Sequence, residues 1–247
     1  MTAASIAGGA QPARTSQRCS QPWAGTAGWA LNGAALALVG YVVVAVTLGA
    51  GFEQDLVVAA EREGVAVNAV ATSTQAQITH DNALYALVTG LFLLLPPAFL
   101  LRAAGKVRTG AGGRLAQLTW WSALATLLVW WSYVGLGLGL FAEPENLPPL
   151  VRDFGPLTVP LVSALSLLAL LTLVFACEAV RGADVARPSA RVATVVCILL
   201  GALSLVALFG AGFEDPVAPI VIVPGALILG IALLRSERRP RAATGAR

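Results

Sequence analysis

Six long apolar segments determine what this chain can fold into. Each has at least about the 20 residues that a helix needs to cross the roughly 30 Å hydrocarbon core of a bilayer. Their apolar residues are continuous, which is typical of membrane helices and excludes the alternating pattern of a barrel strand. The segments cover residues 29–51, 82–102, 115–141, 156–180, 190–213 and 216–235. The sequence therefore predicts an all-α, polytopic membrane protein with six transmembrane helices.

The composition supports the same class of protein. Hydrophobic residues make up 57% and charged residues 12% of the 247 residues, and the mean hydropathy is +0.78. Soluble domains carry about twice this share of charge. We therefore expect the lipid bilayer to be the main partner, with other membrane subunits or further copies of the chain as additional candidates. The odd-numbered segments end in glycines and the even-numbered segments carry prolines, which suggests that the six helices form three hairpins, each with an acidic outer turn.

The positive charges lie in alternate connections. Of the 16 Lys and Arg residues, only Arg62 and Arg152 fall on one side of the predicted bundle. The positive-inside rule places the other side, with both termini, in the cytoplasm. The net charge of +3 then reflects topology and anionic headgroups, and no nucleic acid partner is expected. The basic side contains Arg14, Arg18, Arg102, Lys106, Arg108, Arg114, Arg181, Arg187, Arg191, Arg235, Arg238, Arg239, Arg241 and Arg247.

Three regions make up the predicted domain organisation. Residues 1–26 are rich in small and polar residues, which predicts a disordered cytoplasmic tail. The transmembrane domain follows at 27–236, and 237–247 form a basic cytoplasmic tail. The long outer connection, 52–81, has a spacing that fits a weakly amphipathic helix at the membrane surface, and a mobile loop is the alternative.

The choice of basic residue suggests where the chain comes from. It has 15 Arg and one Lys and is rich in Ala, as is typical of proteins encoded by GC-rich bacterial genomes. This usage makes the bacterial plasma membrane the expected location.

A five-residue motif occurs at the ends of two predicted helices. The sequence Gly-Ala-Gly-Phe-Glu occupies 49–53 and again 210–214. Duplication of a helical hairpin would explain the repeat, and in a chain so rich in Ala and Gly a chance match is the alternative. In both places two glycines end an apolar run and a carboxylate follows, which predicts structural roles for Gly49, Gly51, Gly210 and Gly212.

Prolines occur in the helices predicted to run inward. Pro96 and Pro97 are adjacent near the cytoplasmic end of the second span. Proline removes a backbone hydrogen bond and clashes with the preceding turn, so this pair is expected to kink the helix or to end it.

Acidic residues and the single histidine mark the outer face. Asp81 and Asp215 precede inward helices and fit helix N-caps. Glu53 and Glu214 follow helix C-termini, where a carboxylate is unfavourable unless a positive group compensates. They are either solvated interface acids or part of a mouth that attracts cations. A mixed histidine and carboxylate metal site is a further hypothesis, although no zinc-ligand spacing is present. Its candidate ligands are Glu53, Asp55, His80, Asp81, Glu214 and Asp215.

The third span carries two tryptophan pairs. Trp130 and Trp131 are near its middle, with Tyr133 close by. Packing between helices explains these residues, and a groove for a lipid or a hydrophobic ligand is the alternative.

The middle of every predicted span lacks ionisable side chains. Such residues mark proton relays and ion-coupled transport, so a proton-coupled pump is not expected. No catalytic constellation, cofactor motif or phosphate-binding loop is present either. The leading hypothesis is a non-enzymatic membrane subunit or a permease-like component for a small neutral or hydrophobic molecule. The alternatives are an outer-face, cation-dependent enzyme acting on a lipid or envelope substrate, and a membrane sensor.

Overall fold

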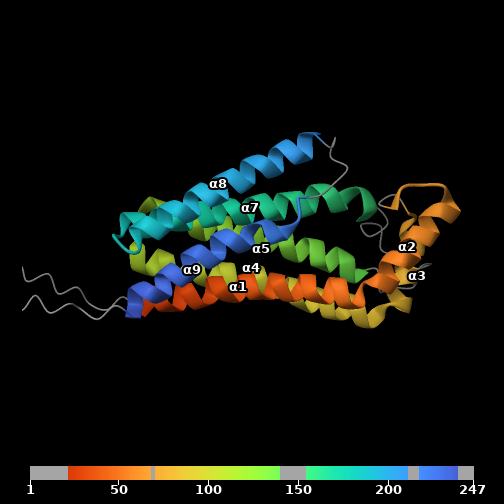
Figure 1. The fold of residues 1–247 in the computed structure, drawn as a ribbon, viewed down its shortest axis with the longest axis horizontal. Coiled ribbons are helices and arrows are strands. Elements are labelled where there is room, and N and C mark those ends of the chain that lie inside the picture. Colours follow the sequence, from red (N-terminus) through yellow and green to blue (C-terminus); the bar gives the residue numbers. More distant parts are fainter. Residues whose placement is uncertain (1–21, 68–69, 140–153, 211–216, 239–247) are drawn as a thin grey trace, which may run out of the picture.

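The computed structural model describes residues 22–67, 70–139, 154–210 and 217–238, and this part of the chain is helical without strands. Figure 1 shows long helices that run side by side and two short helices beyond one end of the bundle. The helices are α1 (Pro22–Leu48), α2 (Ala50–Glu63), α3 (Thr72–Asp81), α4 (Ala83–Ala111), α5 (Gly113–Gly139), α7 (Phe154–Gly182), α8 (Arg187–Gly210), the 3₁₀-helix η3 (Pro219–Ile222) and α9 (Val223–Arg238).

Five helical segments in the described residues are long and apolar enough to cross a membrane. They are Pro22–Leu48, Ala83–Ala111, Thr158–Gly182, Arg187–Gly210 and Pro219–Glu237. The protein is therefore a multi-pass membrane protein by length and composition. Helix α5 has 27 residues, like α1, and is not among these five segments.

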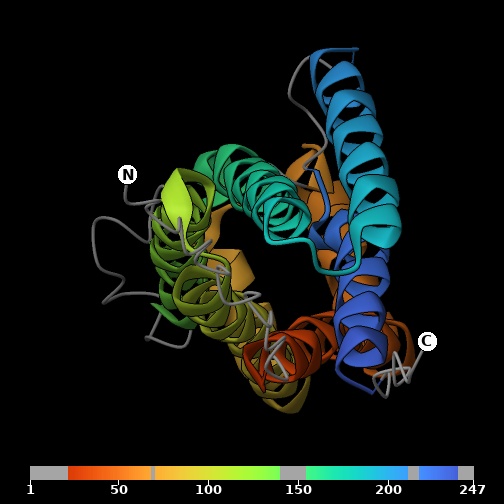
Figure 2. The ribbon, with the colours of Figure 1, turned by 90° about the vertical axis from the view of Figure 1, so that its left-hand side faces the viewer.

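The long helices form a closed ring when viewed along the bundle (Figure 2). The pairs that the sequence predicted as hairpins, α1 with α4, α5 with α7 and α8 with α9, are in contact. Contacts of α4 with α5, α7 with α8 and α1 with α9 connect these pairs into the ring. Helix α8 diverges from α7 toward its C-terminal end (Figure 1).

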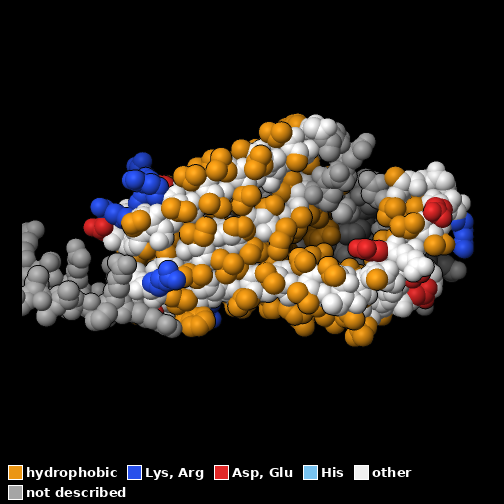
Figure 3. Space-filling view, viewed as in Figure 1, with side chains coloured by type: hydrophobic (Ala, Val, Ile, Leu, Met, Phe, Trp, Pro, Cys, Tyr) orange, Lys and Arg blue, Asp and Glu red, His pale blue; other side chains and the backbone are white. Residues whose placement is uncertain are grey.

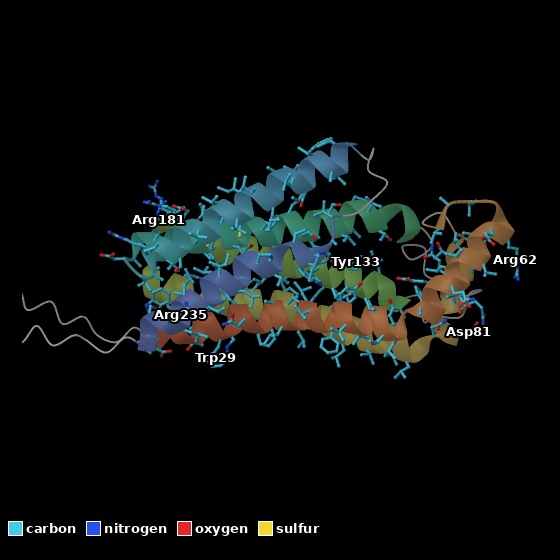
Figure 4. All side chains as sticks on the ribbon, viewed as in Figure 1. Trp29, Arg62, Asp81, Tyr133, Arg181 and Arg235 are labelled. Atoms are coloured by element: carbon cyan, nitrogen blue, oxygen red, sulfur yellow. The ribbon has the colours of Figure 1, made fainter. Side chains whose placement is uncertain are left out.

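Charged side chains gather at the two ends of the bundle, and hydrophobic side chains cover the face between them (Figure 3). Arg181 and Arg235 lie at one end, whereas Arg62 and Asp81 lie on α2 and α3 at the other (Figure 4). We call the first the basic end and the pair of short helices the α2–α3 cap. Because charges avoid hydrocarbon, this distribution fits a slab of lipid between the two ends.

Helix boundaries differ from the predicted ones at several points. Helix α1 begins at Pro22, inside the predicted tail, because proline suits the first helical position and Ala24 is buried. It ends at Leu48, directly before Gly49. Gly49 has helical dihedral angles, so the chain passes into α2 with little interruption, and Gly51 lies in the first turn of α2. Gly210 is the last residue of α8, and Gly212 lies outside the described residues.

Helix α4 does not end at Pro96 and Pro97. It continues through both prolines to Ala111, so most of the predicted second connection is helix. Membrane helices tolerate proline because neighbouring groups satisfy the freed backbone atoms. The turn into α5 instead uses Gly112 and Gly113, whose φ angles of +66° and +80° are in the region that favours glycine.

Helices α1 and α9 cross at two glycines. A Cβ atom on Gly28 would lie 2.7 Å from the carbonyl oxygen of Gly230, so a side chain does not fit between the two backbones. Small residues at a crossing allow the van der Waals contacts that hold membrane helices together. The α1–α9 contact that closes the ring therefore depends on these glycines.

The last span begins with the 3₁₀-helix η3, whose four residues precede the 16 residues of α9. Together they form a helical segment long enough to cross the membrane. Just before this segment, two serines of α7 form hydrogen bonds with the backbone of Val217. The hydroxyl of Ser166 donates to the Val217 carbonyl at 2.6 Å, and the Val217 N–H donates to Ser163 Oγ at 3.1 Å. All three residues are buried. Two serines thus replace the hydrogen bonds that a helix would supply.

We expect the double change S163A/S166A to destabilise the protein by about 2–6 kcal/mol, because it leaves a buried N–H and a buried carbonyl without partners. Unfolding of the detergent-solubilised protein, followed by helix content, measures the effect. S132A is the matched control, because Ser132 is exposed and its hydroxyl donates to Leu128 O in its own helix. Equal stability of the double variant and this control would contradict the role of the two serines.

Candidate functional site

The α2–α3 cap is held together by one carboxylate and a small apolar cluster. Glu63 accepts hydrogen bonds from Thr74 Oγ1 at 2.6 Å and from the Ala71 N–H at 2.9 Å, at the start of α3. These two bonds lower the pKa of Glu63, the Thr74 bond having the larger effect. Beneath them, Ala59, Ala60, Val70 and Ile78 form the apolar cluster. The segment for which the sequence left a helix and a loop open is therefore two packed helices.

Two contacts join this cap to the beginning of α4. The rings of Phe52 and Tyr85 lie with their centroids 5.1 Å apart. The Asn82 side chain donates from Nδ2 to Asp55 Oδ2 at 3.0 Å. Both contacts fix where α2 leaves the bundle.

The predicted metal ligands of the cap are all exposed in the structure. Asp55 accepts a hydrogen bond from the Asn82 side chain, and Asp81 accepts one from the Gln77 side chain at 3.2 Å. Glu53 and His80 are exposed as well. In the described part of the chain, no three His, Cys, Asp or Glu side chains come together to hold a metal ion. Two further predicted ligands, Glu214 and Asp215, lie outside the described residues.

The predicted aromatic groove divides between two environments. Trp130 is fully buried in the core of the bundle, whereas Trp131 is 47% exposed. The indole N–H of Trp131 donates to Leu94 O on α4 at 3.4 Å. Tyr133 is half-buried and packs against the core. Neighbouring residues on a helix point in different directions, so Trp130 and Trp131 do not form one surface.

The buried polar groups in the described interior of the bundle are neutral. The buried polar side chains of the described residues are hydroxyls, including Thr126 and Thr172, whose oxygens are 3.3 Å apart. Two buried side-chain atoms lack a hydrogen-bond partner within the described residues, Trp130 Nε1 and Asn32 Oδ1. Buried polar atoms nearly always form hydrogen bonds in proteins, so each of these two atoms is a candidate to bind a ligand or a water molecule.

A groove of about 620 Å³ opens along α4 at the basic end. Leu95, Ala98, Phe99 and Trp120 form its apolar wall, and Arg102 and Lys106 form its rim. Sequence reasoning used these two cations only as markers of topology. Residues 95, 99, 102 and 106 have a spacing that places them on one side of a helix, and this pattern in the sequence could have indicated the groove. The contribution of Trp120 has no such pattern, because it depends on how α5 packs against α4.

The contact between α2 and α3 is expected to depend on pH through Glu63. Because the folded pKa is lowered, the stabilisation is present above the ordinary carboxyl pKa and is lost as the pH falls through the lowered value. A nitroxide label on a cysteine that replaces the exposed Ser73 should become more mobile in that acidic range. The change E63Q should produce the mobile state already at neutral pH.

The matched control for this experiment is E61Q, because Glu61 is exposed on the same helix. It should behave as the wild type does. Identical pH profiles for the wild type and E63Q would show that another group governs the contact.

Comparison of the chain with protein-family models, with curated proteins and with solved structures found no match.

Proposed function

We propose that α5 is a sixth transmembrane helix. It packs against α4 and α7, both of which are long and apolar enough to cross the membrane. With six spans, the chain ends on the side where it begins, and the positive-inside rule assigns the basic end to the cytoplasm. A bacterial plasma membrane is the location that the residue usage favours.

Within this topology, the protein is a non-enzymatic, permease-like component for a small neutral molecule, acting alone or as a subunit. One observation carries this proposal: the fully buried Trp130 offers an indole N–H without a partner among the described residues. A neutral molecule with a carbonyl or hydroxyl oxygen can accept this hydrogen bond. A charged molecule is disfavoured, because no charged side chain is buried within the described residues.

The surrounding interior supports the same class of ligand. Thr126 lies one helical turn before Trp130, and its hydroxyl approaches Thr172 on α7. Ser163 and Ser166 on α7 hold the start of the last span. Discontinuous helices with satisfied backbone are common where membrane transporters bind their substrates. The last span, α5 and α7 therefore supply the proposed pathway.

Cysteine labelling tests the topology. Single cysteines at Glu61 on the cap and at Arg191 and Arg235 at the basic end replace exposed residues, in a background in which the native cysteines are changed to alanine. In right-side-out membrane vesicles, an impermeant maleimide should label position 61 alone, and after disruption of the vesicles it should label all three. Labelling of 61 together with 191 or 235 in intact vesicles would contradict six spans.

Solute flux tests the function. Proteoliposomes containing the protein should take up urea or glycerol faster than empty liposomes in stopped-flow light scattering. W130F should reduce this increase about fivefold, because it removes one hydrogen bond of about 1 kcal/mol while keeping the ring. W121F is the control, because Trp121 is 62% exposed. No increase with either solute would contradict the permease role of the isolated chain, and co-purification of other chains at fixed stoichiometry would then favour a subunit.

A further inference from the structure

The groove along α4 changes its chemistry from one end to the other. Leu95 and Phe99 lie nearer the middle of the helix, and Arg102 and Lys106 follow one and two turns later toward the basic end. The spacing places all four on one side of α4. None of the described residues that line this groove is acidic. It therefore presents an apolar strip that ends in two positive charges at the basic end of the bundle.

The two cations at the rim are exposed, and neither forms an ion pair with a carboxylate of the described residues. Two arginines elsewhere at the basic end do have such partners. Arg181 pairs with Glu178 at 2.6 Å, and Arg187 pairs with Asp184 at 2.7 Å. The rim of the groove thus retains charge that an external anion can neutralise.

The far wall of the groove is held in place by two contacts. A Cβ atom on Gly105 would lie 3.3 Å from Cζ3 of Trp120, so the glycine allows the indole to lie close to α4. The guanidinium of Arg108 lies over the same indole, 5.6 Å from the ring centroid. This cation–π contact engages Arg108 and leaves Arg102 and Lys106 facing the groove.

We propose that this groove binds one anionic phospholipid, with its phosphate between Arg102 and Lys106 and an acyl chain along Leu95 and Phe99. The charge complementarity and the order of the two surfaces select this occupant. A soluble anion would leave the apolar strip exposed, and a zwitterionic lipid would place its own cation beside the two basic residues. Basic pockets between membrane helices are suited to such headgroups.

An adjoining groove of about 410 Å³ shares Phe99 and Arg102 but is less suited to an anion. Glu237 of α9 lines it and would repel a phosphate. The proposal therefore places the lipid on the Lys106 side of Arg102.

Native mass spectrometry of the full-length protein in mild detergent tests the proposal, with phosphatidylglycerol or phosphatidylcholine added. We expect one phosphatidylglycerol molecule to bind more tightly than phosphatidylcholine. The double change R102Q/K106Q should weaken phosphatidylglycerol binding about 30-fold. The control R191Q/R235Q removes the same charge from exposed positions at the basic end that do not line the groove, and it should bind as the wild type does.

A second variant tests the shape of the site without changing charge. Ala98 is exposed in the groove wall, so A98W should fill the apolar strip and also weaken phosphatidylglycerol binding. Equal losses in R102Q/K106Q and R191Q/R235Q would show diffuse attraction and overturn the proposal. It would also be overturned if A98W left binding unchanged, or if inorganic phosphate at equal concentration displaced the lipid.

Discussion

The structure depends on the rule that a backbone in hydrocarbon must satisfy its own polar groups. Helices do this within one segment, which explains why the described chain is so largely helical. Among the described residues, Val217 shows where the rule requires outside help, just before the 3₁₀-helix η3. There Ser163 and Ser166 of α7 supply the missing donor and acceptor. The exception shows that an irregular backbone is allowed only where another helix covers it.

The low polarity of hydrocarbon also determines where charged side chains lie. Charged side chains gather at the basic end and on the α2–α3 cap, where water can solvate them, while the buried polar groups of the described interior are hydroxyls, an indole and an amide oxygen. A group such as Glu63 can therefore titrate in the cap and act on its packing. Among the described residues, an interior of this kind presents neutral hydrogen-bonding groups and no buried charged side chain.

The sequence predicted the helical class and the approximate positions of the long helices, because a helix that crosses the hydrocarbon core needs a continuous apolar run of matching length. It was less informative about where helices end. Helix α4 runs past Arg102 to Ala111 since charged residues can continue a helix at the interface, and hydropathy marks only the hydrocarbon part. Contacts between residues far apart in the chain leave no local pattern in the sequence. The bond between Glu63 and Thr74 and the approach of Trp120 to Gly105 each require knowledge of how two helices pack.

Trp130 and Arg102 show that a polar group without a protein partner has a different energetic cost when it is buried than when it is exposed. An exposed cation such as Arg102 is solvated by water or headgroups, so the lack of a protein partner costs little and only the adjoining apolar strip makes the position specific. The indole N–H of Trp130 has no such alternative, because the residue is fully buried. Leaving a buried donor unpaired costs about 1–3 kcal/mol. Phe at this position would fill much of the same space without that cost, so the N–H is the feature of this position on which the proposed ligand depends.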